Sequence, residues 1–447
     1  MNATLEKIFR LRRDEVTPAL VLGGVLFLNA AAMQISSVAS ISGFLSNIGV
    51  PQILLVWIAD FAIILLMSAV QSLIVDRVNR VRLIAGVLVA FLAFTLGIRL
   101  LFALDAPPAL NYSLLYLLTD QQWLFLPAIF WVLAADIFSM SQAKRLFPII
   151  TALGLVGKLC GLGLSLIGPS ILSDQLHRPL ADMLWINVLI YAGAFALITL
   201  GLRKYSQTKP LPRSEGVRAT FIEGFQFIRT VPMFRYLTIS VMLLVLCATI
   251  IEFNFLVNAD HTWSSGSSFP EFFATYRIIV ILISMLMQGL FTSRLIERIQ
   301  LKNAFLILPI VTLIVSCVAL LRADVRTAIL AMLTTQIVHD TMNNSASKSL
   351  QSLVPEDKRG RVGIFMDSYL TAAGTIFASL VLGALLVIST ILSLANAAPL
   401  YIGVCLLCAA LAIGAILFMR SHYESSMLNW RLTRRKRATN ILNQLDL

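Results

Sequence analysis

The stretch YLTISVMLLVLCATIIEFNFLV, residues 236–257, holds a single charged side chain, Glu252. About 20 apolar residues are enough for an α-helix to cross a lipid bilayer. Within lipid every backbone N–H and C=O group must find a partner inside the protein, which leaves only helices and closed barrels. Because the stretch is continuously apolar rather than alternating, it predicts a membrane-spanning helix. It also places a carboxylate inside that helix.

Eleven further stretches of this kind follow one another along the chain. The composition agrees with them, since 58% of the residues are hydrophobic, 13% are charged and the mean hydropathy is +0.85. A water-soluble domain of this size would need far more polar surface. We therefore predict an all-α membrane protein with twelve transmembrane helices. The eleven other spans are 17–45, 53–75, 83–105, 112–137, 146–172, 183–202, 271–292, 303–321, 325–346, 362–391 and 397–419.

The net charge of +12 is distributed unevenly. All but six of the 35 lysines and arginines lie in the N-terminus, the C-terminus and the loops on the same side of the predicted bundle. Such a bias marks the cytoplasmic side of a membrane protein, so it places both termini in the cytoplasm. The charge thus indicates topology, and nucleic-acid binding is not expected. We predict a multi-pass protein of the inner membrane of a bacterium. The six exceptions are Arg99, Lys158, Arg178, Arg277, Arg322 and Arg326.

Two loop motifs recur at nearly the same distance along the chain. Arg77 in DRVNRVRL precedes Arg294 in SRLIERIQLKN by 217 positions, and Lys144 in SQAKRLFPII precedes Lys358 in PEDKRGRVGIF by 214 positions. We interpret this spacing as a duplicated unit of six helices. Two six-helix halves with cytoplasmic termini are the arrangement of major facilitator transporters, which bind substrate between the halves at mid-membrane.

The longest cytoplasmic loop separates the two halves. Its second part places Phe221, Phe225 and Ile228 on one helical face, which fits either an amphipathic helix at the membrane surface or an ordinary connector. The predicted domains are an N-terminal half at 1–202, a cytoplasmic linker with this amphipathic helix at 203–235, a C-terminal half at 236–419 and a basic cytoplasmic tail at 420–447.

Three segments resemble the ATP/ADP translocase-like branch of the major facilitator superfamily. They are residues 44–84, DIFSMSQAKRLFPIITALGLVGKLCGLGLS at 136–165 and SLVPEDKRGRVGIFMDSYLTAAG at 352–374. The resemblance runs over most of the chain and implies a multi-pass transporter. In this branch the true nucleotide exchangers are antiporters, and many relatives have no assigned solute.

The nucleotide exchangers of this branch carry a motif similar to Asn-Leu-Val-Glu-Val-x-Trp-Lys in the seventh span. Glu252 in TIIEFNFL falls on its glutamate, whereas Phe255 and Leu256 fall on its tryptophan and lysine. The resemblance therefore implies a role for Glu252. This sequence lacks the motif's lysine, which would be the basic partner of a phosphate group. We predict weak or absent ATP/ADP exchange.

Three charged residues lie well inside predicted spans, namely Glu252, Lys158 and Arg277. A charge at the centre of a spanning helix costs about 2.5–3.5 kcal/mol, so such residues usually face a partner, a substrate or a water-filled cavity. We predict that all three contact the solute, with a structural ion pair as the alternative. Glu252 is also a candidate proton carrier, with Lys158 or Arg277 as its partner. Gly157 and Gly161 beside Lys158 have the spacing that allows close helix packing.

Further polar residues inside spans complete the predicted solute site. Asp60 lies about one third of the way into its span, Asn254 follows Glu252, and Asp120 stands beside two glutamines and a tryptophan in LLTDQQWLF. An aromatic ring and several amides suit a cavity wall, although the cluster at Asp120 also fits an interface with the periplasm. Asp60, Asp120 and Asn254 are therefore substrate-binding candidates.

The tenth span carries a polar face in QIVHDTMNNSASKS. His339 titrates near physiological pH and could pass protons to or from Asp340. We predict either a proton-coupling role or a role in a cytoplasmic gate for this pair.

No enzyme motif accompanies these features. The sequence lacks a P-loop, a nucleophile elbow and a His/Cys metal-binding spacing, and its five cysteines lie inside spans as apolar packing residues. We predict a monomeric secondary transporter that moves a small polar, anionic solute by alternating access, without cofactor or metal. The alternative is a non-transporting sensor or anchoring module of the same fold.

Overall fold

The protein is described by a computed structural model that covers residues 13–74, 78–172, 180–202, 225–263, 268–351, 354, 362–363, 365–394 and 396–445. The regular elements in this part of the chain are all helical. Ten of the described helices are long and apolar enough to cross a membrane. The all-α membrane architecture is thereby confirmed, while the number of twelve spans and the side of the termini stay predictions.

Two of the predicted spans fall on helices outside these ten. The span at 53–75 corresponds to α3 (Ile53–Ile74), whose apolar part is Ile53–Met67. The span at 325–346 is divided between α14 (Val325–Val338), the π-helix η5 (His339–Asn343) and the start of α15 (Asn344–Gln351). The polar run that begins at His339 interrupts the apolar sequence there, and π-helical turns of this kind occur frequently at functional sites.

The chain forms two compact units. The first contains the described residues up to Leu202 together with Ala259–Ile279, and the second contains the remaining described residues. Two helices, α9 (Pro232–Trp263) and α10 (Ser268–Met287), are shared between the units. The predicted division at 1–202, 203–235, 236–419 and 420–447 stays a prediction, and most of the linker with its amphipathic helix lies outside the described residues.

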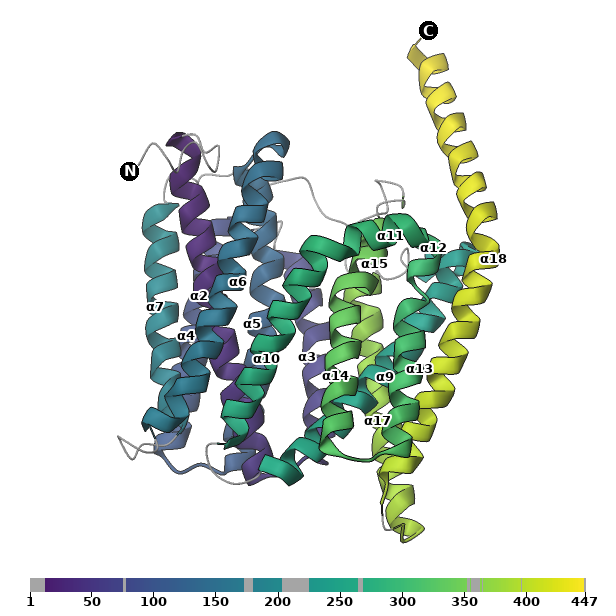
Figure 1. Cartoon of the computed structure of the whole chain (residues 1–447). Helices are drawn as coiled ribbons and strands as arrows, with labels where there is room; N and C mark the ends of the chain where they lie inside the picture. Colours follow the sequence, from purple (N-terminus) through teal and green to yellow (C-terminus); the bar gives the residue numbers. More distant parts are fainter. Residues whose placement is uncertain are drawn as a thin grey trace. The chain divides into compact units, whose positions relative to one another are not determined.

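The first unit is built around α2, which packs against three other helices and lies beside α6 along its length (Figure 1). Leu22, Leu126, Phe130, Tyr191 and Ile198 are fully buried members of its hydrophobic core. The elements of this unit besides α3 and the shared helices are α2 (Arg13–Asn47), α4 (Arg80–Ala103), α5 (Pro108–Ile137), α6 (Met140–Ser170), η2 (Leu180–Met183) and α7 (Leu184–Gly201).

Two glycines bring α2 and α6 into backbone contact. A Cβ atom on Gly157 would lie 2.2 Å from the carbonyl oxygen of Phe27, and one on Gly161 would lie 2.4 Å from that of Ala31. Both distances are far below a van der Waals contact, so only glycine fits. The close helix approach predicted from the spacing of Gly157 and Gly161 is confirmed.

Polar contacts also join the helices of the first unit. Asn187 on α7 donates to the carbonyl of Ala32 at 3.1 Å and to Ser36 Oγ at 2.8 Å on α2. Arg145 on α6 forms an ion pair with the buried carboxylate of Glu15 on α2 at 2.9 Å. Buried polar groups with partners of this kind orient helices in an apolar environment, where an unsatisfied group is costly.

The second unit contains most of α9 and the helices after Ile279. Its α13 packs against both α14 and α18, the long helix drawn in yellow in Figure 1. Cys247, Cys405 and Cys408 are buried here, consistent with packing residues. The elements not yet given are η4 (Gln288–Thr292), α11 (Ser293–Ile299), α12 (Leu301–Ala304), α13 (Ile307–Leu321), η6 (Phe365–Tyr369), α17 (Leu370–Ile391) and α18 (Ala398–Leu445).

Asp324 caps the N-terminus of α14 and lies outside the apolar helices. Its carboxylate accepts the backbone N–H of Thr327 at 2.8 Å, and this bond is the main reason that the pKa of Asp324 lies below its ordinary value. Replacing Asp324 with alanine should therefore lower the melting temperature slightly, by a few degrees at most, and Asp324→Asn should lower it less because an asparagine oxygen still caps the helix.

The pH dependence of that difference follows from the direction of the pKa shift. A carboxylate with a depressed pKa stabilises the fold above the pKa of the unfolded chain, about 3.9, and this contribution disappears as the pH falls through the folded pKa. Melting curves of wild type and Asp324→Ala at several pH values should converge in acid. A difference that is the same at every pH would contradict the role of the charged cap.

Candidate functional site

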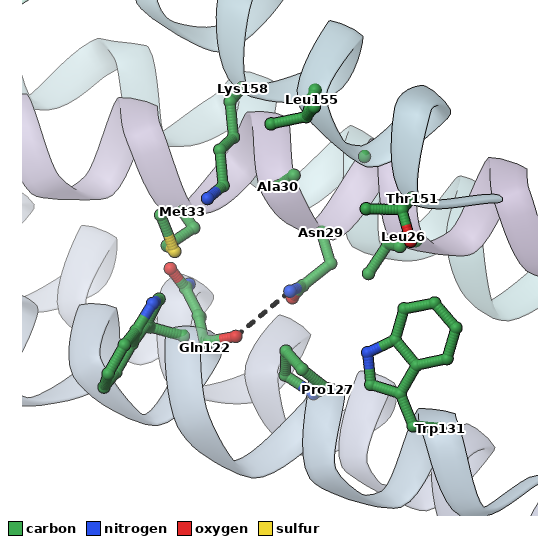
Figure 2. Close-up of a pocket in the computed structure, with 12 residues that line it drawn as sticks. Leu26, Asn29, Ala30, Met33, Gln122, Pro127, Trp131, Thr151, Leu155 and Lys158 are labelled. Atoms are coloured by element: carbon green, nitrogen blue, oxygen red, sulfur yellow. Dashed lines mark hydrogen bonds between the residues drawn. The ribbon is translucent and has the colours of Figure 1, made fainter. Parts of the chain in front are cut away.

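A cavity of about 220 Å³ lies inside the first unit between α2, α5 and α6 (Figure 2). Pro127 on α5 lines it, and a proline nitrogen cannot donate a hydrogen bond to the preceding turn of its helix, which weakens the helix there. Gly154 on α6 also lines the cavity, without a side chain to fill it. A Cβ atom on Gly154 would lie 3.0 Å from the Leu26 side chain, so the glycine lets α6 lie close to α2 beside the cavity.

Amide groups form one wall of the cavity. Asn29 Nδ2 donates to the backbone carbonyl of Gln122 at 3.0 Å, and Tyr191 Oη donates to Asn29 Oδ1 at 3.3 Å. Gln122 itself is fully buried, and both polar atoms of its side chain lack a hydrogen-bond partner among the described residues. Tyr191 lies near this amide without reaching hydrogen-bond geometry. The Gln122 side chain is therefore free to bind a group that enters the cavity.

Lys158 on α6 brings a positive charge to the same cavity. Figure 2 shows its amine reaching inward from α6 toward the part of the cavity where Gln122 and Met33 lie. Trp131 lines the cavity as well and packs against Phe130 and Phe147. An ammonium group, a buried amide and an indole ring together suit a polar solute that carries negative charge.

A second polar group in the first unit contains Arg277. Its Nη1 atom donates to Gln34 Oε1 at 3.0 Å and to Ser37 Oγ at 2.6 Å, both on α2. Its guanidinium carbon lies 5.1 Å from the centre of the Phe273 ring. Arg277 also interacts electrostatically with Asp120 on α5. These contacts fix a cation in the apolar part of the unit.

Asp60 on α3 completes this group. It is fully buried, and neither of its carboxylate oxygens has a hydrogen-bond donor among the described residues. The carboxyl of Asp120 lies close enough to interact with it directly. We call Asp60, Asp120 and Arg277 the carboxyl–guanidinium cluster. The structure thus brings together three residues predicted separately as substrate contacts.

Several of these partners were not predicted from the sequence. Asn29, Gln34, Ser37 and Tyr191 are neutral, and single neutral polar residues are common in transmembrane helices. A signal exists nevertheless, because residues 29–42 of α2 include six buried polar side chains within an apolar span. They are Asn29, Gln34, Ser36, Ser37, Ser40 and Ser42.

The remaining substrate candidates lie in the second unit. Asn254 on α9 is buried and accepts hydrogen bonds from Tyr401 Oη at 3.0 Å and from Asn258 Nδ2 at 3.3 Å. Glu252 lies two residues before it and is partly buried. The predicted pairing of Glu252 with Lys158 or Arg277 stays a prediction.

The predicted proton pair lies in the π-helix η5. His339 Nδ1 and Asp340 Oδ1 are 3.1 Å apart, and their side chains are 52% and 43% exposed. The two residues thus contact each other on an exposed surface. Nearby, Asp367 at the predicted start of a span accepts from Gln351 Nε2 at 2.8 Å and pairs with Lys348, so it links η6 to α15. The described residues contain no group of three His, Cys, Asp or Glu side chains able to hold a metal ion.

Comparison with solved structures identifies the fold of the protein. Its fold is similar to that of the nucleoside transporter NupG, with 15% identity and a TM-score of 0.65 over 91% of this chain and 98% of that one. A bacterial homologue of the iron transporter ferroportin in its inward-facing state gives 13% identity and a TM-score of 0.65 over 92% and 100% of the two chains. The POT family transporter PepTSo gives 12% identity and a TM-score of 0.64 over 90% of this chain and 98% of that one. The protein has the fold of a major facilitator-type transporter.

The sequence itself identifies the family. The pattern of the TLC ATP/ADP transporter family matches residues 95–343, and the chain belongs to this family. No curated protein matches the sequence. The protein is a secondary membrane transporter, and the resemblance noted in the sequence is confirmed.

Proposed function

We propose that the protein moves a small anionic solute across the inner membrane of a bacterium by alternating access, and that Lys158 binds the negative charge of the solute. The observation that carries this proposal is the position of Lys158 beside the unpartnered amide of Gln122 in one cavity. A lysine inside a spanning helix is costly, and such residues normally serve a pathway or a binding site.

The size of the cavity limits what it can hold. Its volume of about 220 Å³ is smaller than the roughly 300–1,000 Å³ of typical pockets for drug-sized ligands. The cavity therefore suits either a small carboxylate or phosphate compound, or the charged end of a larger solute. Lys158 and Gln122 would bind its oxygens, and the Trp131 ring would contact its less polar part.

Nucleotides are the solutes named for the family, and two residues argue against them here. Phe255 and Leu256 on α9 stand where the exchangers have tryptophan and lysine, and both are almost fully buried. An apolar side chain at 256 offers no partner to a phosphate. We therefore keep the prediction that ATP/ADP exchange in proteoliposomes is weak or absent.

The proposal includes a membrane topology of twelve spans. Twelve spans with both termini in the cytoplasm would place the two six-helix halves on either side of a solute pathway. The charge distribution supports this arrangement, because nearly all lysines and arginines lie on one side of the predicted spans. Glu252, Asn254 and the pair His339–Asp340 would serve the C-terminal half, as contacts of the solute or as parts of a gate.

The role of Lys158 can be tested on the purified protein. We expect a thermal-shift screen against carboxylates, phosphates, nucleotides, amino acids and cations to find a stabilising anion. In Lys158→Gln the affinity for that anion should fall by about 10- to 100-fold, since a hydrogen bond to a charged group contributes about 1.5–3 kcal/mol. Lys158→Arg keeps the charge and should retain part of the binding.

The matched control is Lys348→Gln, which removes a lysine whose side chain is 64% exposed in the second unit. It should leave the affinity unchanged. Uptake of the same labelled anion into proteoliposomes then measures transport. Equal binding by wild type and Lys158→Gln, or stabilisation only by cations, would contradict the proposal.

A further inference from the structure

We propose that Asp60 and Asp120 form a proton-binding site of the transporter, separate from the solute cavity. The proposal goes beyond the anionic solute and concerns the ion to which transport is coupled. It begins with Asp60, which is fully buried and receives no hydrogen bond on either carboxylate oxygen from the described residues. An ionised carboxylate in this position would have no donor to stabilise it.

The site is assembled from three helices. Asp60 comes from α3, Asp120 from α5 and Arg277 from α10, and Asp120 interacts with both of the others. Gln34 and Ser37 on α2 hold the guanidinium through two hydrogen bonds. The cluster and its partners therefore come from four helices whose side chains lie far apart in the sequence.

The charges of the cluster do not balance when both acids are ionised. Two carboxylates and one guanidinium leave one negative charge, and part of the hydrogen-bonding capacity of Arg277 is already directed to neutral partners. One proton shared by the two carboxyls makes the cluster neutral. Adjacent carboxylates in a buried site repel each other strongly, and a shared proton removes that repulsion.

Among the described residues, the charged group that acts on Asp60 is Asp120. On α5 the titratable neighbours are Asp120 and Tyr116, whose hydroxyl accepts from Trp57 Nε1 of α3 at 2.8 Å. Arg277 on α10 acts on Asp120 rather than on Asp60, and α2 contributes the neutral Gln34 and Ser37 as partners of Arg277. Both amide atoms of Gln121, next to Asp120, are buried without a partner as well.

A proton at this site would couple to the transport cycle through water access. When the site is closed to water, the neutral, protonated cluster is the stable form, because an uncompensated charge in an apolar medium is costly. When water reaches it, the proton can leave. Any difference in access between the inward and outward states thus becomes a difference in proton affinity between them.

The test uses the full-length protein in nanodiscs and needs no solute. Infrared difference spectra, recorded while the pH is changed, report the C=O stretch of protonated carboxylic acids. Wild type should show such a band near neutral pH, and its area should fall as the pH rises. Asp60→Asn should remove the band, because the amide imitates the protonated acid and leaves Asp120 as the one carboxylate for Arg277. Asp120→Asn should keep a band but change its frequency and its midpoint pH, because Asp60 loses the carboxyl with which it shares the proton.

The control is Asp105→Asn, an exposed residue in a left-handed conformation, with φ of 52°, that asparagine also adopts readily. It should keep the band. Three results would overturn the proposal: a wild-type band that Asp60→Asn retains, a band that Asp120→Asn leaves at the same frequency and midpoint pH, or a band whose area stays constant over the whole pH range in which the protein is folded. If one of the two variants does not fold, the other and the wild-type titration still decide. A failed solute screen with a normal titration would reject only the role of Lys158.

Discussion

Replacement of Gly157 with valine should prevent the protein from folding. The new Cβ would lie 2.2 Å from the carbonyl oxygen of Phe27, so α2 and α6 could not keep their present distance. A flexible side chain could move aside, whereas here the obstacle is the backbone of the central helix of the first unit. Overpacking of a core typically costs about 1–3 kcal/mol, and we expect more than this because two helices must separate.

Fluorescence-detected size-exclusion chromatography of a tagged protein measures the outcome. Gly157→Val should yield aggregate in place of the monodisperse peak, and Gly161→Val should behave similarly. Gly163→Val is the matched control, because a Cβ on Gly163 of the same helix would meet nothing within 4 Å. A normal peak and melting temperature for Gly157→Val would show that the contact between α2 and α6 is not as close as described.

Arg277→Gln should cause the second-largest loss of folding stability. The change removes the guanidinium that interacts with Asp120 and the two hydrogen bonds to Gln34 and Ser37. A hydrogen bond to a charged group contributes about 1.5–3 kcal/mol, and the carboxylate of Asp120 would also lose the positive charge that acts on it. We expect a large fall in the melting temperature and a low yield of folded protein.

A second substitution separates lost charge from lost packing. If the uncompensated carboxylate of Asp120 causes the loss, Arg277→Gln combined with Asp120→Asn should be more stable than Arg277→Gln alone. Arg322→Gln, at an exposed position after α13, is the control for removal of an arginine. A double variant no more stable than the single one would mean that Arg277 acts mainly through packing and its neutral hydrogen bonds.

The sequence predicted the membrane helices well because the bilayer imposes one simple requirement on them. Long apolar runs such as α4 and α9 are long enough to cross the bilayer, so they can be recognised without information about the helices that surround them. The prediction was weakest at 325–346, where His339 and the polar residues after it end the apolar run and the helix changes to a π-turn. The close contact at Gly157 and Gly161 could also be predicted, because small residues at this spacing have few other uses in a span.

The site was predicted in part, and the physical reason is the same for each residue. Charges inside apolar spans stand out, so Lys158, Asp60, Asp120 and Arg277 could be found. The sequence could not show which of these residues contact one another. The hydrophobic pattern of a single helix does not reveal that α3, α5 and α10 lie together. Asp60 and Asp120 were therefore assigned to the solute one by one, and the interaction between their carboxyls was not foreseen. Their assignment to the solute stays a prediction.

The assignment of Ala259–Ile279 to the first unit sets an order of events during synthesis. Asp60 and Asp120 leave the ribosome long before Arg277, which comes only after α9 has been made. Until then the nascent N-terminal helices hold two acids without their cation, so this unit cannot reach its final state from its own first 202 residues. We expect the same of a gene split in the central loop: the N-terminal fragment alone should be unstable, and coexpression with the C-terminal fragment should restore it.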